Sequence, residues 1–131
     1  MKIDTMKKLN LILLFFGLVG WSQTETKNSP EFKFDQTTID YGNIEKGSDG
    51  YRTFVFTNIG NAPLIVSDIR SSCGCTIPEK PLEPIMPGKK GEIKVHYDTN
   101  RVGAFQKNIT IYSNAKTVEF TIFIKGVVVT K

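Results

Sequence analysis

Few of the residues that usually carry out chemistry are present in this chain. Its 131 residues include one histidine, two cysteines and one tryptophan. The sequence has no nucleophile-elbow motif that could supply a serine to act with the one histidine, His96, so a serine hydrolase is not indicated. A calcium site needs a dense cluster of oxygen ligands. The carboxylates of the turns and strand ends are instead scattered along the chain: Asp35, Asp40, Glu45, Asp49 and Asp68. The sequence therefore predicts a protein that is not an enzyme.

A run of apolar residues long enough to span a membrane is also missing. The longest such run, Leu9 to Val19, falls well short of the about 20 residues that a transmembrane helix needs. Basic residues precede it and small residues follow it: Lys2, Lys7, Lys8, Gly20 and Ser22. This pattern is typical of a signal peptide. We therefore expect residues 1–22 to be cleaved, leaving a secreted or periplasmic protein with no membrane span.

Neither sign of charge dominates the remainder. Of 17 basic and 13 acidic residues, three basic and one acidic lie in the predicted signal peptide, so cleavage lowers the formal net charge from +4 to about +2. A stripe of basic residues with interleaved aromatic residues, as nucleic-acid surfaces have, does not occur. The only tryptophan, Trp21, lies in the segment to be removed. The composition therefore does not indicate a nucleic-acid partner.

Helical periodicity is absent as well, and short alternating runs take its place. Residues 23–30 are polar and predict a flexible leader. Beyond them, Phe54 and Phe56 share one face of a run, and a later run directs its apolar residues to one side: Ile93, Val95 and Tyr97. Four of the six prolines fall within residues 77–91, where a central strand is not expected. The pattern predicts one all-β domain over residues 31–131, an antiparallel β-sandwich of about seven strands.

The last two strands allow the register to be predicted. Pairing them around residues 114–115 brings apolar residues opposite one another: Ile111 with Val118, Ile109 with Phe120, and Phe105 with Ile124. Lys107, opposite Ile122, is the one misfit on this face. A slip by one residue would turn every side chain to the other face, so the agreement favours this pairing. Because Ala115 does not suit a tight two-residue turn, we expect a longer or bulged loop.

Several short motifs resemble those of a known family: Tyr41-Gly42, Phe54 to Asn58, Pro63-Leu64, Ser72 to Thr76, Pro87-Gly88, Ser113-Asn114 and Lys125 to Val127. The chain is similar to a secreted bacterial family classed only as a domain of unknown function, with a Cys-Gly-Cys-Thr signature. The resemblance implies an immunoglobulin-like fold, similar to hydin and major-sperm-protein domains, which serve mainly as interaction modules. It implies no activity, cofactor or catalytic residue.

The two cysteines, Cys73 and Cys75, can form only one internal disulfide, and an oxidising compartment would favour it. A ring of three residues contributes only about 1.6 kcal/mol by the chain-entropy estimate, against about 4 kcal/mol for a bridge closing some 60 residues. A disulfide between these two cysteines would therefore not be a main source of stability for the whole domain. Three interpretations stay open: a structural clamp or packed thiol pair, a redox-active or mixed-disulfide site, and a Cu(I) site. A metal site would need further ligands, for which His96 and Met86 are the only candidates.

Three further residues are expected to shape loops. Gly74 would allow the bend between the cysteines, and Thr76 and Asn58 would hydrogen-bond turn backbone. We therefore expect an exported non-enzymatic module that binds an unknown protein partner of the cell envelope, through a sheet edge or the loop from Cys73 to Thr76. The alternative is a small thiol–disulfide or Cu(I)-binding protein that acts through Cys73 and Cys75.

Overall fold

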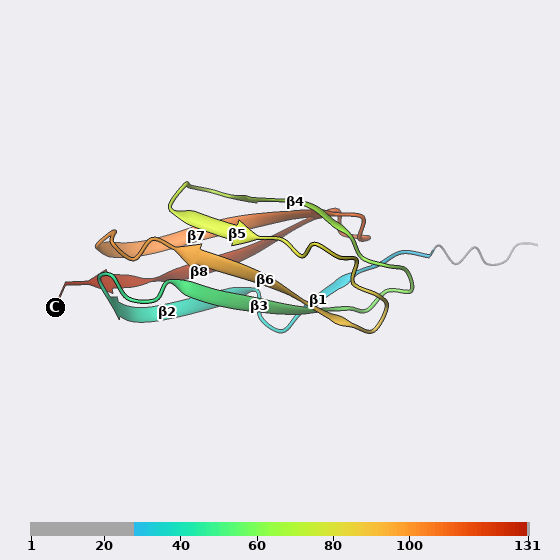
Figure 1. Cartoon of the computed structure of the whole chain (residues 1–131), viewed down its shortest axis with the longest axis horizontal. Helices are drawn as coiled ribbons and strands as arrows, with labels where there is room; N and C mark the ends of the chain where they lie inside the picture. The colour runs from blue at the N-terminus through green and yellow to red at the C-terminus, as the bar shows by residue number, and fades with distance from the viewer. Residues whose placement is uncertain (1–27, 131) are drawn as a thin grey trace, which may run out of the picture.

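The computed structural model describes residues 28–130 as two stacked four-stranded β-sheets (Figure 1). The predicted signal peptide (1–22) and residues 23–27 of the predicted leader lie outside the described residues. The strands within the described part are β1 (Phe32–Phe34), β2 (Thr38–Glu45), β3 (Tyr51–Asn58), β4 (Val66–Ser71), β5 (Thr76–Glu79), β6 (Lys90–Tyr97), β7 (Gly103–Ser113) and β8 (Glu119–Val129). Between residues 28 and 130 no helix is long and apolar enough to cross a membrane.

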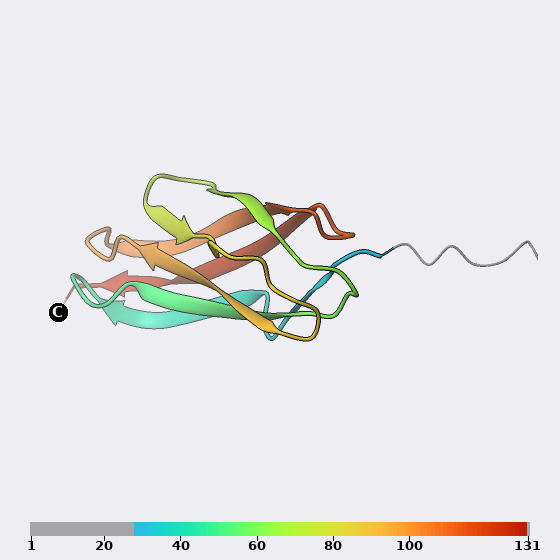
Figure 2. The ribbon, with the colours of Figure 1, turned by 45° about the vertical axis from the view of Figure 1, so that its right-hand side comes forward.

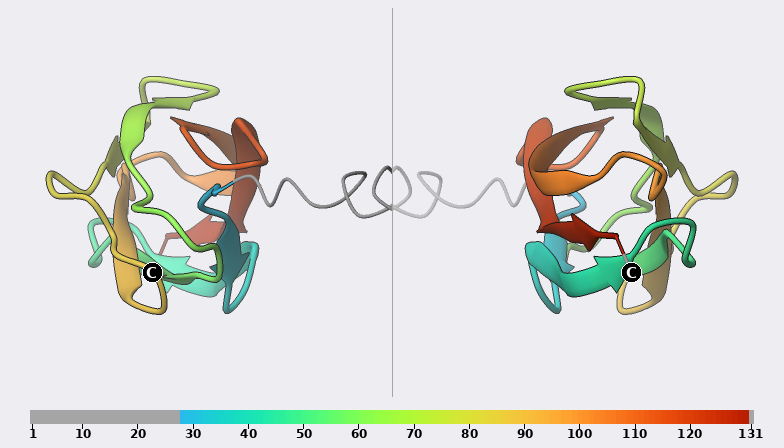
Figure 3. Two further views of the ribbon diagram at one scale, coloured as in Figure 1. Left: turned by 90° about the vertical axis from the view of Figure 1, so that its right-hand side faces the viewer. Right: turned by 90° about the vertical axis from the view of Figure 1, so that its left-hand side faces the viewer.

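The strand order is β1-β3-β6-β5 in one sheet and β2-β8-β7-β4 in the other. Seen along the long axis, the strands surround a common interior (Figure 3). The sequence predicted about seven strands, and β5 is the one it did not anticipate. β5 is an edge strand of four residues. An edge position tolerates Pro78, which has no N–H to donate to a neighbouring strand.

One pairing departs from the antiparallel expectation: β2 runs parallel to β8. β1 and β2 are consecutive in the chain but belong to different sheets, so the chain crosses between layers before it joins the second edge. The register of β2 shifts between Asp40 and Asn43, where Gly42 adopts a φ of +69°. Alternation of apolar residues reports the face of a strand, not the direction of its neighbour, so the sequence pattern could not reveal this parallel pair.

The core lies between the two sheets, where the alternating residues meet. The alternation predicted for β3 and β6 is confirmed, because the inward residues are buried: Phe54, Phe56, Ile93, Val95 and Tyr97. β7 and β8 contribute the facing layer: Phe105, Ile109, Ile111, Ile122 and Ile124. Aromatic rings pack at both ends of the core. Phe32 and Phe56 lie at one end, with ring centroids 5.1 Å apart, and the stacked pair Tyr97 and Phe105 lies at the other, with ring centroids 3.8 Å apart.

The register of β7 and β8 differs from the predicted one by two residues. Ile111 pairs with Phe120 and Ile109 with Ile122, so Val118 lies in the loop and is exposed. A shift of two residues keeps the paired residues on their predicted faces, which is why the core was predicted correctly apart from Val118 and the partners were not.

The connecting loop is longer than a tight turn, as expected, because its residues bond elsewhere. The Asn114 side chain accepts from the N–H of Ile65 at 2.8 Å and donates to the carbonyl of Pro63 at 3.1 Å. These contacts with the β3–β4 loop are tertiary, and a hairpin considered alone does not contain them.

Tyr41 of β2 combines burial with a polar contact. Its hydroxyl donates to the carbonyl of Gly50 at 2.8 Å, and the Arg52 guanidinium lies 4.2 Å from the centre of its ring. Burial is the main cause that raises the pKa of Tyr41 to about 12. This side chain therefore ties β2 to the start of β3 in its protonated form.

We predict that Tyr41 makes the fold sensitive to alkaline pH. Its folded-state pKa of about 12 exceeds the ordinary value of 10.0, so between these values the folded protein keeps a proton that the unfolded chain releases. The stabilisation is fully present below pH 10 and is lost as the pH rises toward 12, by up to about 3 kcal/mol. Urea unfolding from pH 8 to 12 should show a smaller alkaline loss in Tyr41→Phe than in wild type. Equal losses in both proteins would contradict this assignment.

Candidate functional site

The signature Cys-Gly-Cys-Thr forms the corner at which the chain passes from one sheet to the other. β4 is an edge of one sheet and β5 is an edge of the facing sheet, and residues 72–75 connect them (Figure 2). Only four residues make this crossing. Their backbone groups must therefore find partners in a tight bend instead of a strand ladder.

Hydrogen bonds hold both sides of this corner. On the β4 side, Ser72 N–H donates to the carbonyl of Asn108 at 3.0 Å, and Asn108 N–H donates to the Ser72 hydroxyl at 3.1 Å. The Ser71 hydroxyl lies 2.7 Å from the carbonyls of both Cys73 and Thr76 and can donate its proton to either. The bend is thus fastened to β7 by atoms other than sulfur.

The β5 side of the corner is held in the same manner. Thr76 N–H donates to the carbonyl of Cys73 at 3.3 Å, and Asp98 N–H donates to the carbonyl of Cys75 at 2.9 Å. The Thr76 side chain is buried, with its hydroxyl 3.8 Å from the Cys75 sulfur. The corner is therefore anchored to the β6–β7 turn as well.

The two cysteines form a disulfide across Gly74. Their Cα atoms are 5.3 Å apart, within the ordinary range for a disulfide. Cys75 is only 7% exposed and belongs to the core, whereas Cys73 is half-buried and packs against it. Cys75 N–H donates to the Cys73 sulfur at 3.1 Å. The two sulfurs therefore differ in access and in hydrogen bonding.

Gly74 lies in the turn of the corner without a backbone conformation that requires glycine. It is absent from the glycines with positive φ, and a Cβ placed on it would meet no atom within 4 Å. Both the conformation and the space would accept alanine. What glycine provides here is an uncovered approach to the disulfide, since Gly74 is exposed.

The two candidate metal ligands outside the signature lie apart from the sulfurs. Met86 belongs to the β5–β6 loop at the far end of the sandwich, where Gly88 N–H donates to the carbonyl of Asn58. His96 is on the outer face of β6, paired with Tyr51 and Ile77 of the neighbouring strands. Among residues 28–130, no group of three or more possible ligands from His, Cys, Asp and Glu lies together.

Exposed apolar side chains lie at the same end of the sandwich as the corner. We call the turns 46–50 and 98–102, the corner 72–75 and the adjoining strand residues Tyr51 and Ile77 the disulfide end. Gly47 N–H and the Thr99 hydroxyl link its turns through main-chain carbonyls. Tyr51, Ile77 and Val102 are each more than half exposed. The His96 ring lies against Tyr51, with centroids 4.4 Å apart. The disulfide end therefore offers apolar surface beside a partly accessible disulfide.

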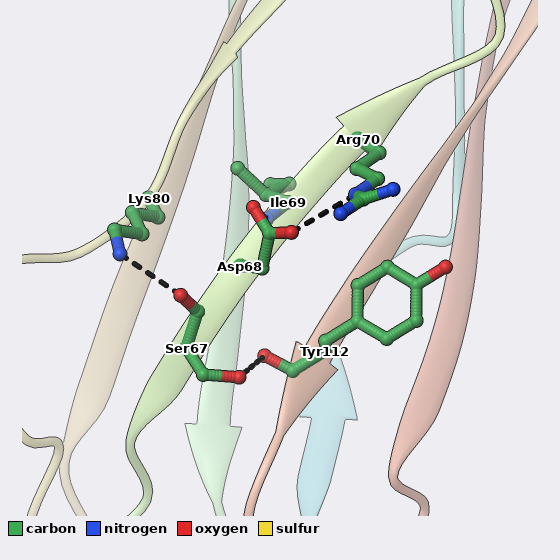
Figure 4. A network of polar contacts seen from close by, with 6 residues as sticks. All are labelled: Ser67, Asp68, Ile69, Arg70, Lys80 and Tyr112. Carbon is green, nitrogen blue, oxygen red and sulfur yellow. Dashed lines mark hydrogen bonds and ion pairs between the residues drawn. The ribbon is translucent and has the colours of Figure 1, made fainter.

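The free edge of β4 is blocked by its own side chains. Antiparallel hydrogen-bonded pairs alternate along a strand, and Ser72 bonds to β7, so the N–H of Ile69 lies on the side away from β7. That N–H donates to Asp68 Oδ1 at 2.8 Å. Arg70 holds the same carboxylate through a 2.9 Å ion pair (Figure 4). The hydrogen bond from Arg70 is the largest cause of a lowered pKa of Asp68.

A second contact covers the carbonyl side of the β4 edge. The Lys80 ammonium donates to the carbonyl of Ser67 at 3.0 Å, and the Ser67 hydroxyl donates to the carbonyl of Tyr112 at 3.1 Å (Figure 4). Ser67 sits at a register shift of β4. Bulges and charges at edges prevent a further strand from adding. Sequence reasoning missed this protection of the edge.

The remaining edge strands are also poor templates for strand addition. β1 has three residues, and β5 has four, including Pro78. β2 is longer but carries the register shift, and there the Asp40 carboxylate accepts from the N–H of Gly42 at 2.8 Å. Within the described residues, every sheet edge is thus short, interrupted or capped.

Asn58 organises the opposite end of the sandwich. Its side chain is fully buried, and its Nδ2 donates to the carbonyls of Ala62 and Ile85 at 2.8 and 2.9 Å. Its Oδ1 accepts from the N–H groups of Gly60 and Glu31 at 2.9 and 3.3 Å. One amide therefore joins the start of β1, the β3–β4 loop and the β5–β6 loop, a region that we call the Asn58 end.

Replacing Asn58 should be among the most damaging changes to this fold. Asn58→Ala leaves several buried polar groups without partners, each costing about 1–3 kcal/mol, so we expect a loss of at least about 3 kcal/mol in the free energy of unfolding. Asn58→Asp should also be severe, because it presents an acceptor to two carbonyls. The exposed Asn43→Ala is the matched control, expected within about 0.5 kcal/mol of wild type. Chemical denaturation measures all three, and a mild Asn58→Ala would refute the role.

The disulfide should contribute little to stability. The double variant Cys73→Ser, Cys75→Ser loses a ring of only three residues, so we expect it to fold with a loss of at most about 2 kcal/mol. Ser71→Ala removes the hydroxyl that serves two carbonyls and should cost at least as much, about 1–3 kcal/mol. Gly74→Ala should be nearly neutral. Urea unfolding of the four proteins tests this order, and an unfolded double variant would overturn it.

Comparisons with solved structures confirm the immunoglobulin-like sandwich. A protein of unknown function from Porphyromonas gingivalis W83 aligns with a TM-score of 0.69 and 15% identity, over 82% of this chain and 51% of that one. PapD-like domain 7 of human CEP192 gives 0.65 and 7%, over 84% and 93%. The CsuC–CsuE chaperone–tip adhesion subunit complex of Acinetobacter baumannii gives 0.56 and 15%, over 74% and 56%. At these identities the likeness concerns the fold alone, and the chain spans about half the length of the P. gingivalis protein.

Sequence comparison supplies the family. Curated proteins gave no match. The model of the family described as "Protein of unknown function (DUF1573)" matches residues 32–128, which include every strand from β1 to β7 and nearly all of β8. The expected resemblance is confirmed, and this protein belongs to the DUF1573 family.

Proposed function

We propose that this protein is an exported, non-enzymatic interaction module that binds a polypeptide of the cell envelope through its disulfide end. The sequence supports export through the predicted signal peptide over residues 1–22. The fold supports a binding role by likeness, since the A. baumannii neighbour is a chaperone in complex with a tip adhesion subunit. Loops on a rigid sandwich are common binding sites.

The observation that carries the proposal is the contrast between the edges and the disulfide end. A sheet edge was one of two expected binding surfaces, and β4 disfavours it most clearly, with Ile69 N–H capped by Asp68 and Ser67 carbonyl capped by Lys80. The other expected surface, the loop from Cys73 to Thr76, lies at the end of the sandwich that also carries the exposed apolar side chains of Tyr51, Ile77 and Val102. Recognition by side chains at the disulfide end therefore fits better than strand addition.

The partner that this surface fits is a polypeptide segment with apolar side chains. Tyr51 offers a large ring whose face is already supported by His96, and aromatic residues of this kind are common anchors in protein interfaces. Isoleucine and valine beside it add apolar area without charge. A purely electrostatic ligand would gain little from these three side chains.

Thiol–disulfide exchange is the second candidate function. It is favoured by one specific observation, a disulfide whose Cys73 half is only half-buried beneath the exposed Gly74. Binding of Cu(I), the other alternative, gains no such support, because Met86 lies at the Asn58 end and His96 on the outer face of β6.

The binding proposal can be tested with two matched triple variants. Tyr51→Ser, Ile77→Ser, Val102→Ser alters side chains that are 52, 59 and 54% exposed, and Ile59→Ser, Ile65→Ser, Val118→Ser alters ones that are 57, 48 and 60% exposed. A partner is first identified by crosslinking in the native envelope, and its affinity for each purified variant is then measured by calorimetry.

The first triple variant should weaken binding at least about tenfold, equivalent to 1.4 kcal/mol, while the second stays within about twofold of wild type. The reverse order would move the interface to the Asn58 end and refute the proposal. Equal weakening by both variants, with unchanged unfolding curves, would also contradict it.

A further inference from the structure

We propose that Cys73, Cys75 and Lys107 form a thiol–disulfide exchange site for a cysteine of a partner protein. Cys73 is the sulfur that bonds to the partner, Cys75 is the resolving sulfur, and Lys107 supplies a positive charge that favours the Cys73 thiolate. The assignment rests on the exchange reaction given above as the second candidate function, and it names the residues, their roles and the class of substrate.

Access and hydrogen bonding distinguish the two sulfurs. Cys75 is buried in the core at 7% exposure, whereas Cys73 is half-buried beside the exposed Gly74. Only Cys73 receives a main-chain hydrogen bond, from Cys75 N–H at 3.1 Å. A donor aimed at sulfur stabilises its thiolate. An incoming thiolate therefore reaches Cys73 more easily, and a reduced pair carries its negative charge more readily on Cys73.

The register between β4 and β7 gives the position of Lys107 relative to the corner. Ser71 pairs with Ile109, and the next residue, Ser72, bonds to Asn108. Cys73 follows Ser72 in the bend, and Lys107 precedes Asn108 on β7, so both residues adjoin the same hydrogen-bonded pair. Alternate residues share a face, so Lys107 is on the same side of β7 as buried Ile109, and it is itself half-buried. The one charge that did not fit the apolar face of this hairpin thus directly precedes the β7 residue that bonds to Ser72, which itself precedes Cys73.

Other ionisable groups belong to the strands on either side of the corner and to the β6–β7 turn. Arg70 of β4 is exposed and paired with Asp68, and Glu79 and Lys80 at the end of β5 are exposed. Asp98 bonds to the corner through its N–H, but its Oδ1 accepts from Asn100 N–H at 3.0 Å within its own turn. Burial raises the pKa of Tyr97, and the charge of Arg101 in the same turn partly offsets that rise. His96 is on the outer face of β6. Lys107 is therefore the basic residue on the core side of the corner, and its removal should raise the pKa of Cys73.

The scaffold does not depend on the bond that would exchange. Ser71, Ser72, Thr76 and Asp98 hold the corner by hydrogen bonds that involve no sulfur. A ring of three residues also adds little to the stability of the fold. The corner can therefore keep its shape in the oxidised, mixed-disulfide and reduced forms, which an exchange site requires.

The reaction balances without another component. A partner thiolate attacks the Cys73 sulfur, a bond between partner and Cys73 forms, the Cys73–Cys75 bond breaks, and Cys75 leaves as a thiolate that takes up a proton. A second thiolate of the partner then attacks the partner's sulfur in the mixed disulfide, and Cys73 leaves. The partner gains a disulfide and the pair gains two electrons. The same steps reversed reduce a partner disulfide.

Trapping the mixed disulfide tests the roles of the two sulfurs. Reduced full-length Cys75→Ser and Cys73→Ser proteins are mixed with glutathione disulfide and followed by intact mass. The Cys75→Ser protein, which keeps Cys73, should form a lasting glutathione adduct at least about tenfold faster than Cys73→Ser. Reduced wild type should pass through the adduct to the internal disulfide. Faster reaction of Cys73→Ser would reverse the roles and overturn the assignment.

Lys107 is tested as a positioning residue in the Cys75→Ser background. The rate of alkylation by neutral iodoacetamide against pH gives the pKa of Cys73. Lys107→Met should raise the midpoint of this profile, Lys107→Arg should leave it near its original value, and Lys125→Met on the exposed face of β8 is the matched control, expected to change nothing. An unmoved midpoint in Lys107→Met would overturn the role of Lys107 while exchange itself stands.

A failure of exchange has a different signature. If neither single-cysteine protein forms an adduct with glutathione disulfide when folded, but both do so in urea, the exchange function and this assignment are both wrong. The binding of a partner at the disulfide end would be unaffected by that result, since the triple variants measure it independently.

Discussion

The connection between β4 and β5 is the constraint on which the rest of this structure depends. These strands are the neighbouring edges of two sheets, and stacked sheets lie about 10 Å apart. Four residues, Ser72 to Cys75, make the crossing. A bend this short cannot satisfy its backbone by strand pairing, so Ser71, Asn108 and Asp98 supply the missing partners. The disulfide is placed by that bend and does not create it.

The two ends of the sandwich consequently differ in character. At the Asn58 end, one buried amide joins three segments, and its four hydrogen bonds hold those segments in place relative to one another. At the disulfide end, the polar contacts are spread over several backbone groups, and apolar side chains such as Tyr51 and Val102 remain exposed. The first arrangement specifies the fold, whereas the second leaves surface available for recognition and for chemistry at sulfur.

The sequence indicated which face of each strand is buried, but not which residues lie opposite one another on neighbouring strands. Phe54, Phe56, Ile93 and Val95 were assigned to the core correctly because alternation is local information. The pairing of Ile111 was wrong by two residues because the side chain of Asn114 bonds to the β3–β4 loop, a contact between distant segments. The parallel pairing of β2 with β8 was hidden for the same reason.

For the candidate site, the signature residues were identified from the sequence, but the residues that act together with them were not. Cys73 and Cys75 could be singled out because they are the only cysteines. Gly74 lies in the bend without a positive φ, so the backbone there does not by itself require glycine. Lys107 was noted only as a misfit, because its relation to Cys73 depends on the pairing of β4 with β7. The Asp68–Arg70 pair gains its role at the edge from tertiary structure alone.

Amide hydrogen exchange, compared between the oxidised and the reduced wild-type protein, tests most directly whether the corner stands without its disulfide. The informative amides are those of Ser72, Thr76 and Asp98, which donate to the carbonyls of Asn108, Cys73 and Cys75. We expect their protection to fall by no more than about thirtyfold on reduction, the factor that corresponds to the upper limit of about 2 kcal/mol for the small ring that is opened. Free exchange at these three amides, with β3 and β7 still protected, would show that sulfur holds the corner and would contradict the account.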